Sequence, residues 1–334
     1  MAFKMQIGYS SILNPRETVT AISETKNELI KNLKTTFKLL EVEPAIICRE
    51  ETGLNDDFRI SERPIDFDIL PSNLVGEILQ THNKWRRSVI QKYDILNDEG
   101  ILTVTNPLRR DIVQSINQAV VCSEIGFDIL VEEKQLTMHN LEQIVKKLVK
   151  VIYHVEDNLL KTYPQLNRKF SEKTNWVNYN ELVKSMRLLT YQERIDKYTR
   201  ENGPVILYGL QDVIKNGSLD LNESFDVVDW ELYTKIFVYD FILEKAICVG
   251  YCAASVGKEA LKRQLAVTKE IIKIRTNYDA KLAKDELPPT ITCGIYKTQL
   301  DLLLLEKQHI AEVVPSIWED DFLEYVNKNG IEIL

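Results

Sequence analysis

Residues 286–300 read ELPPTITCGIYKTQL, and this stretch decides the fold. Proline cannot continue a helix, so the Pro-Pro pair ends the helix that apolar spacing predicts over residues 256–283. The β-branched and apolar residues after the prolines predict a strand over 290–295, and the leucine-rich residues after that strand predict a helix over 296–307. The stretch therefore predicts one strand that leads directly into one helix near the end of the chain.

Elements of both kinds precede this strand–helix pair. Apolar residues at helical spacing predict helices over 18–40 and 76–93, and a third helix from residue 141, where Asn140 begins a sequence like a capping box. Apolar runs predict strands at residues 45–48, 100–108, 117–125, 205–208, 235–243 and 246–254. Because no repeat and no low-complexity linker interrupts these elements, we expect one continuous α+β domain around a mainly antiparallel sheet.

The composition excludes several classes of protein. An average glycine usage of about 7% would give roughly 23 glycines in a chain of 334 residues, and this chain has 12. Neither GxGxxG nor GxxxxGKS/T occurs, so a Rossmann or Walker phosphate loop has no support. The net charge of −8 argues against a general nucleic-acid binder, since such proteins are usually basic. The chain is predicted to be an ordinary globular protein without a nucleic-acid partner.

The cysteines and the apolar segments indicate a cytoplasmic protein without a membrane partner. No stretch approaches 18 apolar residues without charge, and the N-terminal residues lack the apolar core of a signal peptide. Five cysteines at scattered spacing favour a reduced setting. Cys248 and Cys252 are close enough in sequence to suggest zinc, but no histidine lies near them, so two small residues of a buried strand are the favoured interpretation.

Several stretches resemble, in the same order, the A-type asparagine synthetases, which are aspartate–ammonia ligases. Residues 286–300 resemble motif 3 of that family. The other matching stretches are residues 52–57 (TGLNDD) and 62–67 (ERPIDF), which resemble the aspartate-site loop, and residues 84–87 (KWRR) and 108–111 (LRRD), which resemble the KWKR segment and motif 2. The matches follow the family's order with almost no gaps from about residue 20 to the end. Any one of them alone would be weak, but together they are specific for this family.

The resemblance implies a class II aminoacyl-tRNA synthetase-like fold, with a six-to-eight-stranded, mainly antiparallel sheet flanked by helices. One such domain would span residues 1–334, with 1–18 as an N-terminal extension. The family reaction uses ATP and Mg²⁺ to activate the aspartate side chain as aspartyl-adenylate, which ammonia then attacks to give asparagine. The implied partners are a second copy of the chain, in a homodimer, and an amino-acid-like small molecule.

Some positions that match the family's site keep chemistry suited to that reaction. Asp56 matches the carboxylate of the aspartate-site loop, and Arg109 matches the motif 2 arginine that holds the α-phosphate, so both are predicted to be catalytic. Arg86 and Glu124 match substrate-binding positions, where the family usually has Lys and Gln. The structural alternatives are a turn residue at Asp56 and a solvated basic loop at Arg109.

More positions depart from the family pattern than keep it. The predicted degenerate nucleotide and metal positions are Lys235, Cys248, Gly250, Tyr251, Ser255 and Gln299. Gln299 replaces the motif 3 arginine that grips the far phosphates. Gly250 and Tyr251 replace a pair of serines, and Ser255 replaces an arginine expected to hold a substrate carboxylate. Lys235 and Cys248 replace the two carboxylates that hold Mg²⁺, and a lysine places positive charge where the cation should bind. No metal site is therefore predicted.

Two functions are compatible with this mixture of kept and lost residues. The first is a divergent, catalytically impaired protein that keeps the dimeric scaffold as a binding or regulatory module, with Tyr251 and Tyr296 partly filling the nucleotide pocket. The second is a working, AMP-forming aspartate–ammonia ligase, or a related carbon–nitrogen ligase for another acid, which needs ATP and Mg²⁺. The losses favour the first, because each phosphate or metal contact contributes about 2–4 kcal/mol to such a step.

Overall fold

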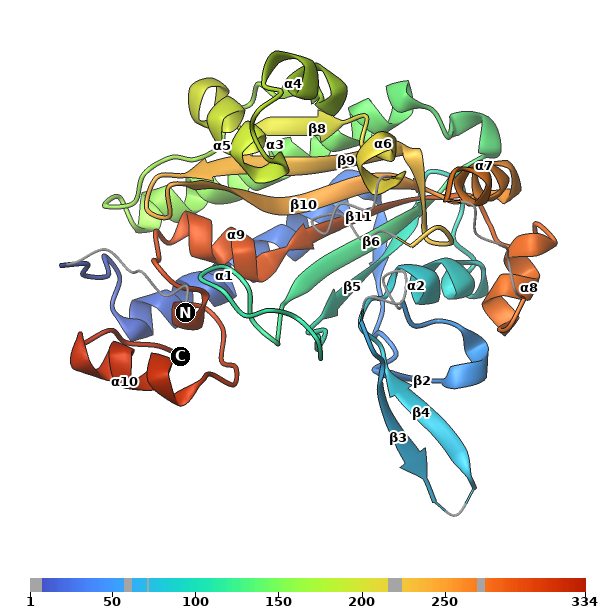
Figure 1. The fold of residues 1–334 in the computed structure, drawn as a ribbon, viewed down its shortest axis with the longest axis horizontal. Helices are drawn as coiled ribbons and strands as arrows, with labels where there is room; N and C mark the ends of the chain where they lie inside the picture. Colours follow the sequence, from blue (N-terminus) through green and yellow to red (C-terminus); the bar gives the residue numbers. More distant parts are fainter. Residues whose placement is uncertain (1–7, 57–61, 71, 216–223, 269–273) are drawn as a thin grey trace.

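The computed structural model describes residues 8–56, 62–70, 72–215, 224–268 and 274–334. Within them, eight strands form one sheet in the order β1-β5-β6-β11-β10-β9-β8-β7 (Figure 1). The strands are β1 (Leu39–Glu41), β5 (Gly100–Thr105), β6 (Glu124–Leu130), β7 (Asn175–Asn178), β8 (Val205–Tyr208), β9 (Val228–Asp240), β10 (Lys245–Ser255) and β11 (Thr290–Tyr296). Only the β1–β5 and β7–β8 pairs of this sheet are parallel, which confirms the predicted α+β class and the mainly antiparallel sheet.

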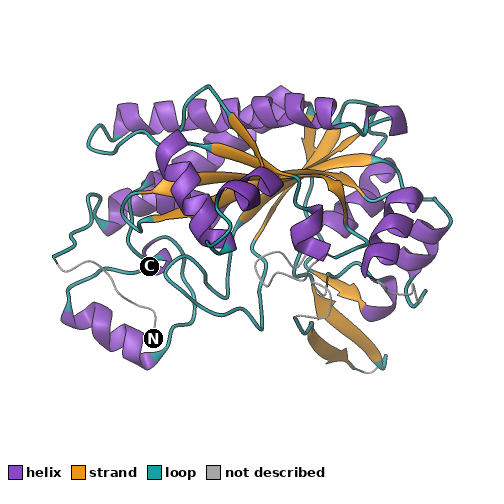
Figure 2. Cartoon of the chain, turned by 45° about the horizontal axis from the view of Figure 1, so that its top comes forward, coloured by secondary structure: helices purple, strands orange, loops and turns teal. Residues whose placement is uncertain are grey.

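Helices cover both faces of this sheet. The described helices are α1 (Pro15–Phe37), α2 (Asn83–Val89), α3 (Met138–Thr162), α4 (Tyr179–Ser185), α5 (Tyr191–Asn202), α6 (Gln211–Lys215), α7 (Lys258–Thr268), α8 (Asn277–Ala283), α9 (Lys297–Leu304) and α10 (Asp320–Lys328). The long helices α1 and α3 share one apolar core with the sheet, and α4, α5 and α6 share a second core with its opposite face. Figure 2 shows long helices running along one side of the strands.

The pleat of the central strands decides which residues face the helices. Successive side chains of a strand point to opposite faces. The residues of β6 and β11 that pack against α1 and α3 are Ile125, Phe127, Ile129, Ile291, Cys293 and Ile295, all buried. The residues between them face the other side, and these are Glu124, Gly126, Asp128, Thr290, Thr292, Gly294 and Tyr296. The central strands therefore have one apolar face and one face of polar and small residues, which we call the polar face.

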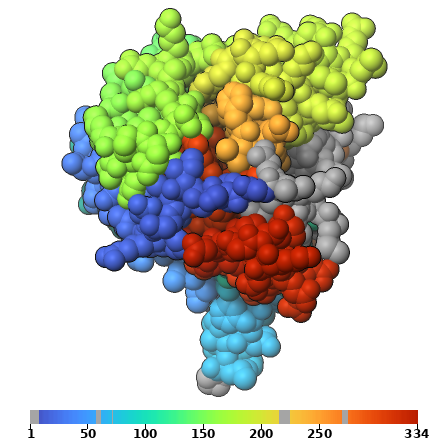
Figure 3. Space-filling view, turned by 90° about the vertical axis from the view of Figure 1, so that its left-hand side faces the viewer, coloured from blue at the N-terminus to red at the C-terminus, as the bar shows by residue number. Residues whose placement is uncertain are grey.

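A smaller sheet, which we call the arm, projects from the body of the molecule (Figures 1 and 3). It has three strands in the order β2 (Ile47–Arg49), β4 (Leu74–Ile78) and β3 (Ile65–Ile69). The chain passes from the arm into α2, so the base of the arm lies beside the helix that carries the KWRR residues.

The structure corrects several predicted element boundaries. Residues 76–78 belong to β4 rather than to a helix, because the apolar residues of that strand and of α2 together imitate helical spacing. The strand predicted over 117–125 begins only at Glu124, since residues 106–123 form a loop. Two helices, α7 and α8, replace the single helix predicted over 256–283. Helix α3 begins earlier than predicted, because Thr137 and not Asn140 is its N-cap.

Strand β9 begins at Val228, seven residues before the predicted start at residue 235. The other predicted elements lie within a few residues of their expected places, and β8 matches its predicted range. Residues 1–7 of the predicted N-terminal extension lie outside the described residues. Within its remainder, Leu13 is fully buried, and the Tyr9 hydroxyl donates to Glu312 Oε2 at 2.9 Å. Among the helices that the structure describes, none combines the length and the apolar character needed to cross a membrane.

Candidate functional site

A buried ion pair lies at the centre of the polar face. The Arg86 guanidinium, carried by α2, is fully buried, and its Nε donates to Asp128 Oδ2 at 2.5 Å. It also donates to Asn83 Oδ1 at 2.5 Å, and its Nη1 lies 3.8 Å from Glu124 Oε1. Burial lowers the pKa of this guanidinium, but Asp128 and Glu124 outweigh burial and hold that pKa above its ordinary value. Arg86 is therefore a charged group whose counter-ions belong to the protein itself.

The Tyr251 ring covers Gly294 on the neighbouring strand. The two residues are register partners in β10 and β11, and a side-chain carbon on Gly294 would collide with the ring. The Tyr251 hydroxyl donates to Asn83 Oδ1 at 2.9 Å, and the Tyr251 and Tyr296 ring centres are 5.6 Å apart. Burial raises the pKa of the Tyr251 phenol well above its ordinary value, so the group stays a neutral donor.

Arg86 covers a second glycine in the same way. A side-chain carbon on Gly126 of β6 would collide with the guanidinium. Gly126 and Gly294 are themselves register partners, and Arg86 and Tyr251 both bond to Asn83, so the two side chains lie next to each other over the middle of the sheet. Together they cover this part of the polar face.

The residues at the expected metal positions do not fit Mg²⁺. Lys235 of β9 is the register partner of Tyr251, and its ammonium lies 5.5 Å from the centre of the Tyr233 ring. Cys248 is half-buried on β10, and its thiol lies 3.6 Å from the Gly250 carbonyl oxygen. Mg²⁺ requires oxygen ligands in octahedral geometry. In the part of the chain that the structure describes, no three His, Cys, Asp or Glu side chains are grouped so as to hold a metal.

Arg109 lies in the loop between β5 and β6 and is bound by residues at the base of the arm. Its guanidinium pairs with the Glu62 carboxylate, with Nε at 2.8 Å from Oε2. Arg63 and Asp111 form a second ion pair at 2.5 Å across the same contact. The Arg109 side chain is 30% exposed, so an anion could reach it from solvent. A phosphate at this arginine would have to compete with Glu62.

Gln299 and Ser255 hold the protein's own backbone. Gln299 Nε2 donates to the Asn117 carbonyl oxygen at 3.3 Å. Ser255 Oγ accepts from the Thr290 amide at 2.9 Å and thereby joins an end of β10 to β11. Gly250 lies at a break in the β9–β10 register, where a bulge interrupts the pairing. Neither the amide nor the hydroxyl supplies the positive charge that a triphosphate needs, so these positions do not fit ATP.

Asp56 belongs to a separate buried cluster. It is 4% exposed, and it accepts a hydrogen bond from the Ser224 hydroxyl. Lys84 of α2 pairs with Asp226 at 2.6 Å. Burial lowers the pKa of the Lys84 ammonium, but the carboxylates of Asp226 and Asp56 outweigh burial and raise that pKa above its ordinary value. Asp57, the next acid of the matched loop, lies outside the described residues.

The structure therefore brings only some of the predicted site residues together. Those that meet over the middle of the sheet are Arg86, Glu124, Lys235 and Tyr251. Gly250 instead pairs with Ile295, on the apolar face of the sheet. Asp56 lies with Lys84, and Arg109 lies with Glu62, so each of the two predicted catalytic residues has a different set of neighbours.

Sequence reasoning misses two residues that organise this centre. Asp128 follows Glu124 and Gly126 at intervals of two, so strand alternation was a signal that could have identified it. Asn83 stands three residues before Arg86, on the same face of α2, which is a weaker signal. The sequence held no sign that Glu62 would bind Arg109.

Comparisons with known proteins concern the whole chain rather than the individual site residues. The family model described as aspartate-ammonia ligase matches residues 16–330. The chain is 29% identical to the aspartate–ammonia ligase of Bacillus cereus (strain B4264) over 325 residues, which cover 97% of this chain and 99% of that protein. The same figures hold for the aspartate–ammonia ligase of Bacillus thuringiensis (strain Al Hakam).

The solved structures with a similar fold are tRNA synthetases. The asparaginyl-tRNA synthetase of Entamoeba histolytica in complex with asparaginyl-adenylate gives a TM-score of 0.67 at 12% identity, covering 91% of this chain and 68% of that one. The asparaginyl-tRNA synthetase of Pyrococcus horikoshii complexed with asparaginyl-adenylate gives a TM-score of 0.62 at 13% identity, covering 89% of this chain and 68% of that one. At such identities the likeness concerns the fold, which is that of the class II synthetases.

Proposed function

The chain belongs to the aspartate–ammonia ligase family, and from this we propose that it is a divergent member whose ordinary ligase activity is impaired or repurposed. The family uses ATP to amidate aspartate through aspartyl-adenylate. The observation that carries the proposal is the Tyr251 ring, which covers Gly294 and is anchored to Asn83. The resemblance places a small serine at this position, so the tyrosine adds a buried ring where a nucleotide would approach the backbone.

The charges beside the ring support the same proposal. Gln299 is neutral where the family grips the far phosphates, and Lys235 is cationic where the family binds Mg²⁺. Each such contact contributes about 2–4 kcal/mol, so losing two contacts slows the reaction by roughly 10³- to 10⁶-fold. The protein then keeps the scaffold as a binding or regulatory module.

An activity assay tests this proposal. Purified protein is mixed with ATP, Mg²⁺, aspartate and ammonium, and asparagine and AMP are measured, with the Bacillus cereus ligase as positive control. We expect a rate at least about 10³-fold below that of the control. A rate within tenfold of the control would overturn the proposal.

A working ligase is the second candidate, and the retention of Asp56, Arg86 and Arg109 favours it. This ligase would act on aspartate or on another acid, would form AMP, and would need ATP and Mg²⁺. Glu124 or Glu244 would replace a lost metal ligand. Calorimetry with ATP distinguishes the two candidates. If the protein is folded, as cooperative melting would show, and ATP gives no heat of binding, then the result argues against a ligase acting on aspartate or on another acid.

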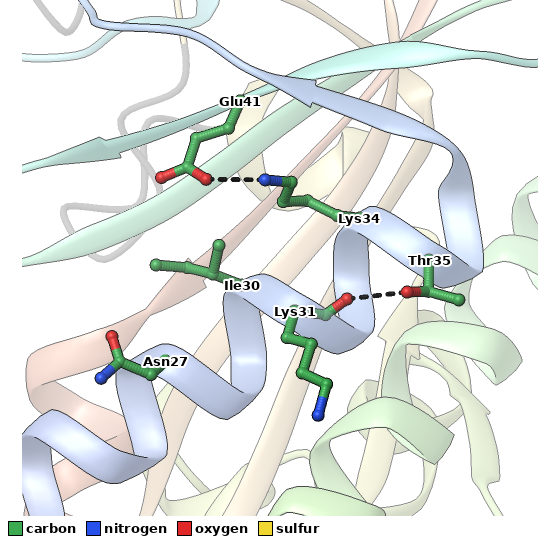
Figure 4. A pocket seen from close by; sticks show the side chains of 6 residues that line it. All are labelled: Asn27, Ile30, Lys31, Lys34, Thr35 and Glu41. Atoms are coloured by element: carbon green, nitrogen blue, oxygen red, sulfur yellow. Dashed lines mark hydrogen bonds and ion pairs between the residues drawn. The ribbon is translucent and has the colours of Figure 1, made fainter.

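We also propose that the protein is a homodimer that packs through α1. Val19 and Leu40 are about half exposed, at 51% and 47%. A hollow of about 400 Å³ lies beside the C-terminal half of α1. Figure 4 shows the residues that line it, Ile30 among them. A second cavity of about 450 Å³ opens near Val19 and Ile22. A second α1 would cover these apolar side chains. Light scattering tests this, with Val19→Asp expected to shift the protein toward the monomer.

The remaining expectations concern the ligand and the setting. We propose an amino-acid-like small molecule as ligand, no nucleic-acid partner and a cytoplasmic setting. The net charge of −8 and the five scattered cysteines support these expectations. An electrophoretic shift assay with total tRNA is expected to show no complex.

A further inference from the structure

Two cysteines face each other across the central sheet, on the side away from the candidate site. Cys252 of β10 and Cys293 of β11 are register partners, and both are fully buried in the core under α1 and α3. Their sulfur atoms are 2.6 Å apart, and the structure records both residues as free thiols. The other three cysteines, Cys48, Cys122 and Cys248, are half-buried and lie on other parts of the fold.

The backbone at this pair suits a covalent bond. Directly opposed residues of antiparallel strands have Cα atoms about 4.5–5.5 Å apart. A disulfide requires a Cα separation of about 4.4–6.8 Å. Register partners of this kind therefore fall within the range of Cα separations that a disulfide can span.

We propose that Cys252 and Cys293 are a dithiol that forms an intramolecular disulfide and ties β10 to β11. A small-molecule disulfide such as oxidised glutathione is the oxidant. One cysteine thiolate attacks it, forms a mixed disulfide and releases one glutathione. The second cysteine then displaces the other glutathione, so two protein thiols are oxidised while one glutathione disulfide is reduced to two thiols.

The burial of the pair determines when this exchange takes place. The attacking species is the thiolate, and burial raises the pKa of the Cys293 thiol well above its ordinary value. Oxidant also cannot reach a side chain that has no exposed surface. Thiol–disulfide exchange at Cys252 and Cys293 therefore occurs during folding, before the two cysteines are buried. The folded protein then keeps the redox state in which it folded. A protein that folds in a reducing compartment keeps the dithiol.

The proposed disulfide would join the pair of residues next to the Tyr251–Gly294 pair of the candidate site. Tyr251 and Gly294 directly precede and follow Cys252 and Cys293 in the β10–β11 pairing. A covalent bond at this pair holds together the two strands that place the Tyr251 ring over the glycine. It also closes a loop that runs from residue 252 to residue 293, which restricts the unfolded chain.

Oxidative refolding of the wild-type protein tests the proposal. Denatured, reduced protein is refolded with either a glutathione redox buffer or dithiothreitol, then unfolded in acid, alkylated and digested without reductant. We expect a cross-linked peptide pair containing Cys252 and Cys293 only after refolding in the glutathione buffer. The oxidised protein should melt about 5 °C higher than the reduced protein.

Variants and the folded protein supply the controls. Cys293→Ala should abolish both the cross-link and the difference in melting temperature, whereas Cys48→Ser should keep both. Folded, reduced protein exposed to oxidised glutathione should remain uncross-linked. Complete alkylation of both cysteines after refolding of the wild type in glutathione buffer would overturn the proposal, and this result does not depend on any variant. Rapid cross-linking of the folded protein would overturn the claim that burial protects the pair.

Discussion

Replacing Asp128 with asparagine should destabilise the protein strongly. The substitution keeps the shape of the side chain but removes the main counter-ion of Arg86, which is fully buried. Removing one partner of a buried ion pair costs about 3–5 kcal/mol, because the other charge is left without compensation. We expect the lower end of this range, about 3 kcal/mol, since Glu124 still lies 3.8 Å from the guanidinium.

The melting temperature gives a second measure of the same loss. The entropy of unfolding is about 2.1 cal/mol/K per residue, so a loss of about 3 kcal/mol in a chain of this length lowers the melting temperature by about 4 °C. The free energy of unfolding is measured by chemical denaturation, and the melting temperature by calorimetry. The matched control is the double variant Arg86→Met/Asp128→Asn, which removes the buried charge itself and should recover most of the loss.

The comparison of these variants can refute the reasoning. If Asp128→Asn costs less than about 1 kcal/mol, then Arg86 is not an uncompensated charge in that variant, and the ion pair does not organise the polar face. If the double variant is as unstable as Asp128→Asn, then the loss comes from the hydrogen bonds that Asp128 accepts from Thr290 and Thr292 rather than from the charge.

Three further substitutions test other contacts. Tyr251→Ser should cost about 3–5 kcal/mol of stability in denaturation experiments. Calorimetry should show that this variant binds ATP more tightly than the wild type does. Unchanged ATP binding would mean that the Tyr251 ring does not block the nucleotide. Glu62→Gln should release Arg109 and lower the free energy of unfolding by less than about 1 kcal/mol, since the ion pair is partly exposed. Amide hydrogen exchange should become faster in the loop between β5 and β6 but should stay unchanged in α3. Burial raises the pKa of Glu156 from 4.5 to about 7, so the folded protein keeps this carboxyl protonated to a higher pH than the unfolded chain does. Its contribution to stability is therefore fully present below about pH 4.5 and is lost as the pH rises through 7. Between pH 5 and pH 8 the wild type should therefore lose about 3 kcal/mol relative to Glu156→Gln, and equal pH dependence of the two proteins would contradict this.

Local patterns predicted the C-terminal strand–helix pair and most of the central strands. Proline positions and apolar runs act over a few residues, so they locate β10, β11 and α9 without knowledge of the rest of the chain. The same patterns were wrong over residues 76–93, where a strand and a helix that follow each other both carry apolar residues. Periodicity alone cannot separate two short elements whose apolar positions happen to be in phase.

The candidate site was only partly predictable for a different reason. Matching motifs pointed to Arg86, Arg109 and Asp56 one position at a time. The partners of these residues, such as Glu62 for Arg109, are far away in the sequence and become neighbours only through the packing of the arm on the loop. An ion pair between two segments that are far apart in the sequence leaves no pattern in either segment.

The sequence by itself determined which chemical groups are available at each position. Gln299 stands where the family's reaction needs a cation, and Lys235 and Cys248 stand where it needs metal ligands. Tyr251 stands where the family has a serine. What only the tertiary structure decided is that Tyr251 covers Gly294 and that Arg86 covers Gly126. The physical reason is long-range packing: the register of β10 and β11 sets Tyr251 opposite Gly294, and the packing of α2 on the polar face lays Arg86 over Gly126.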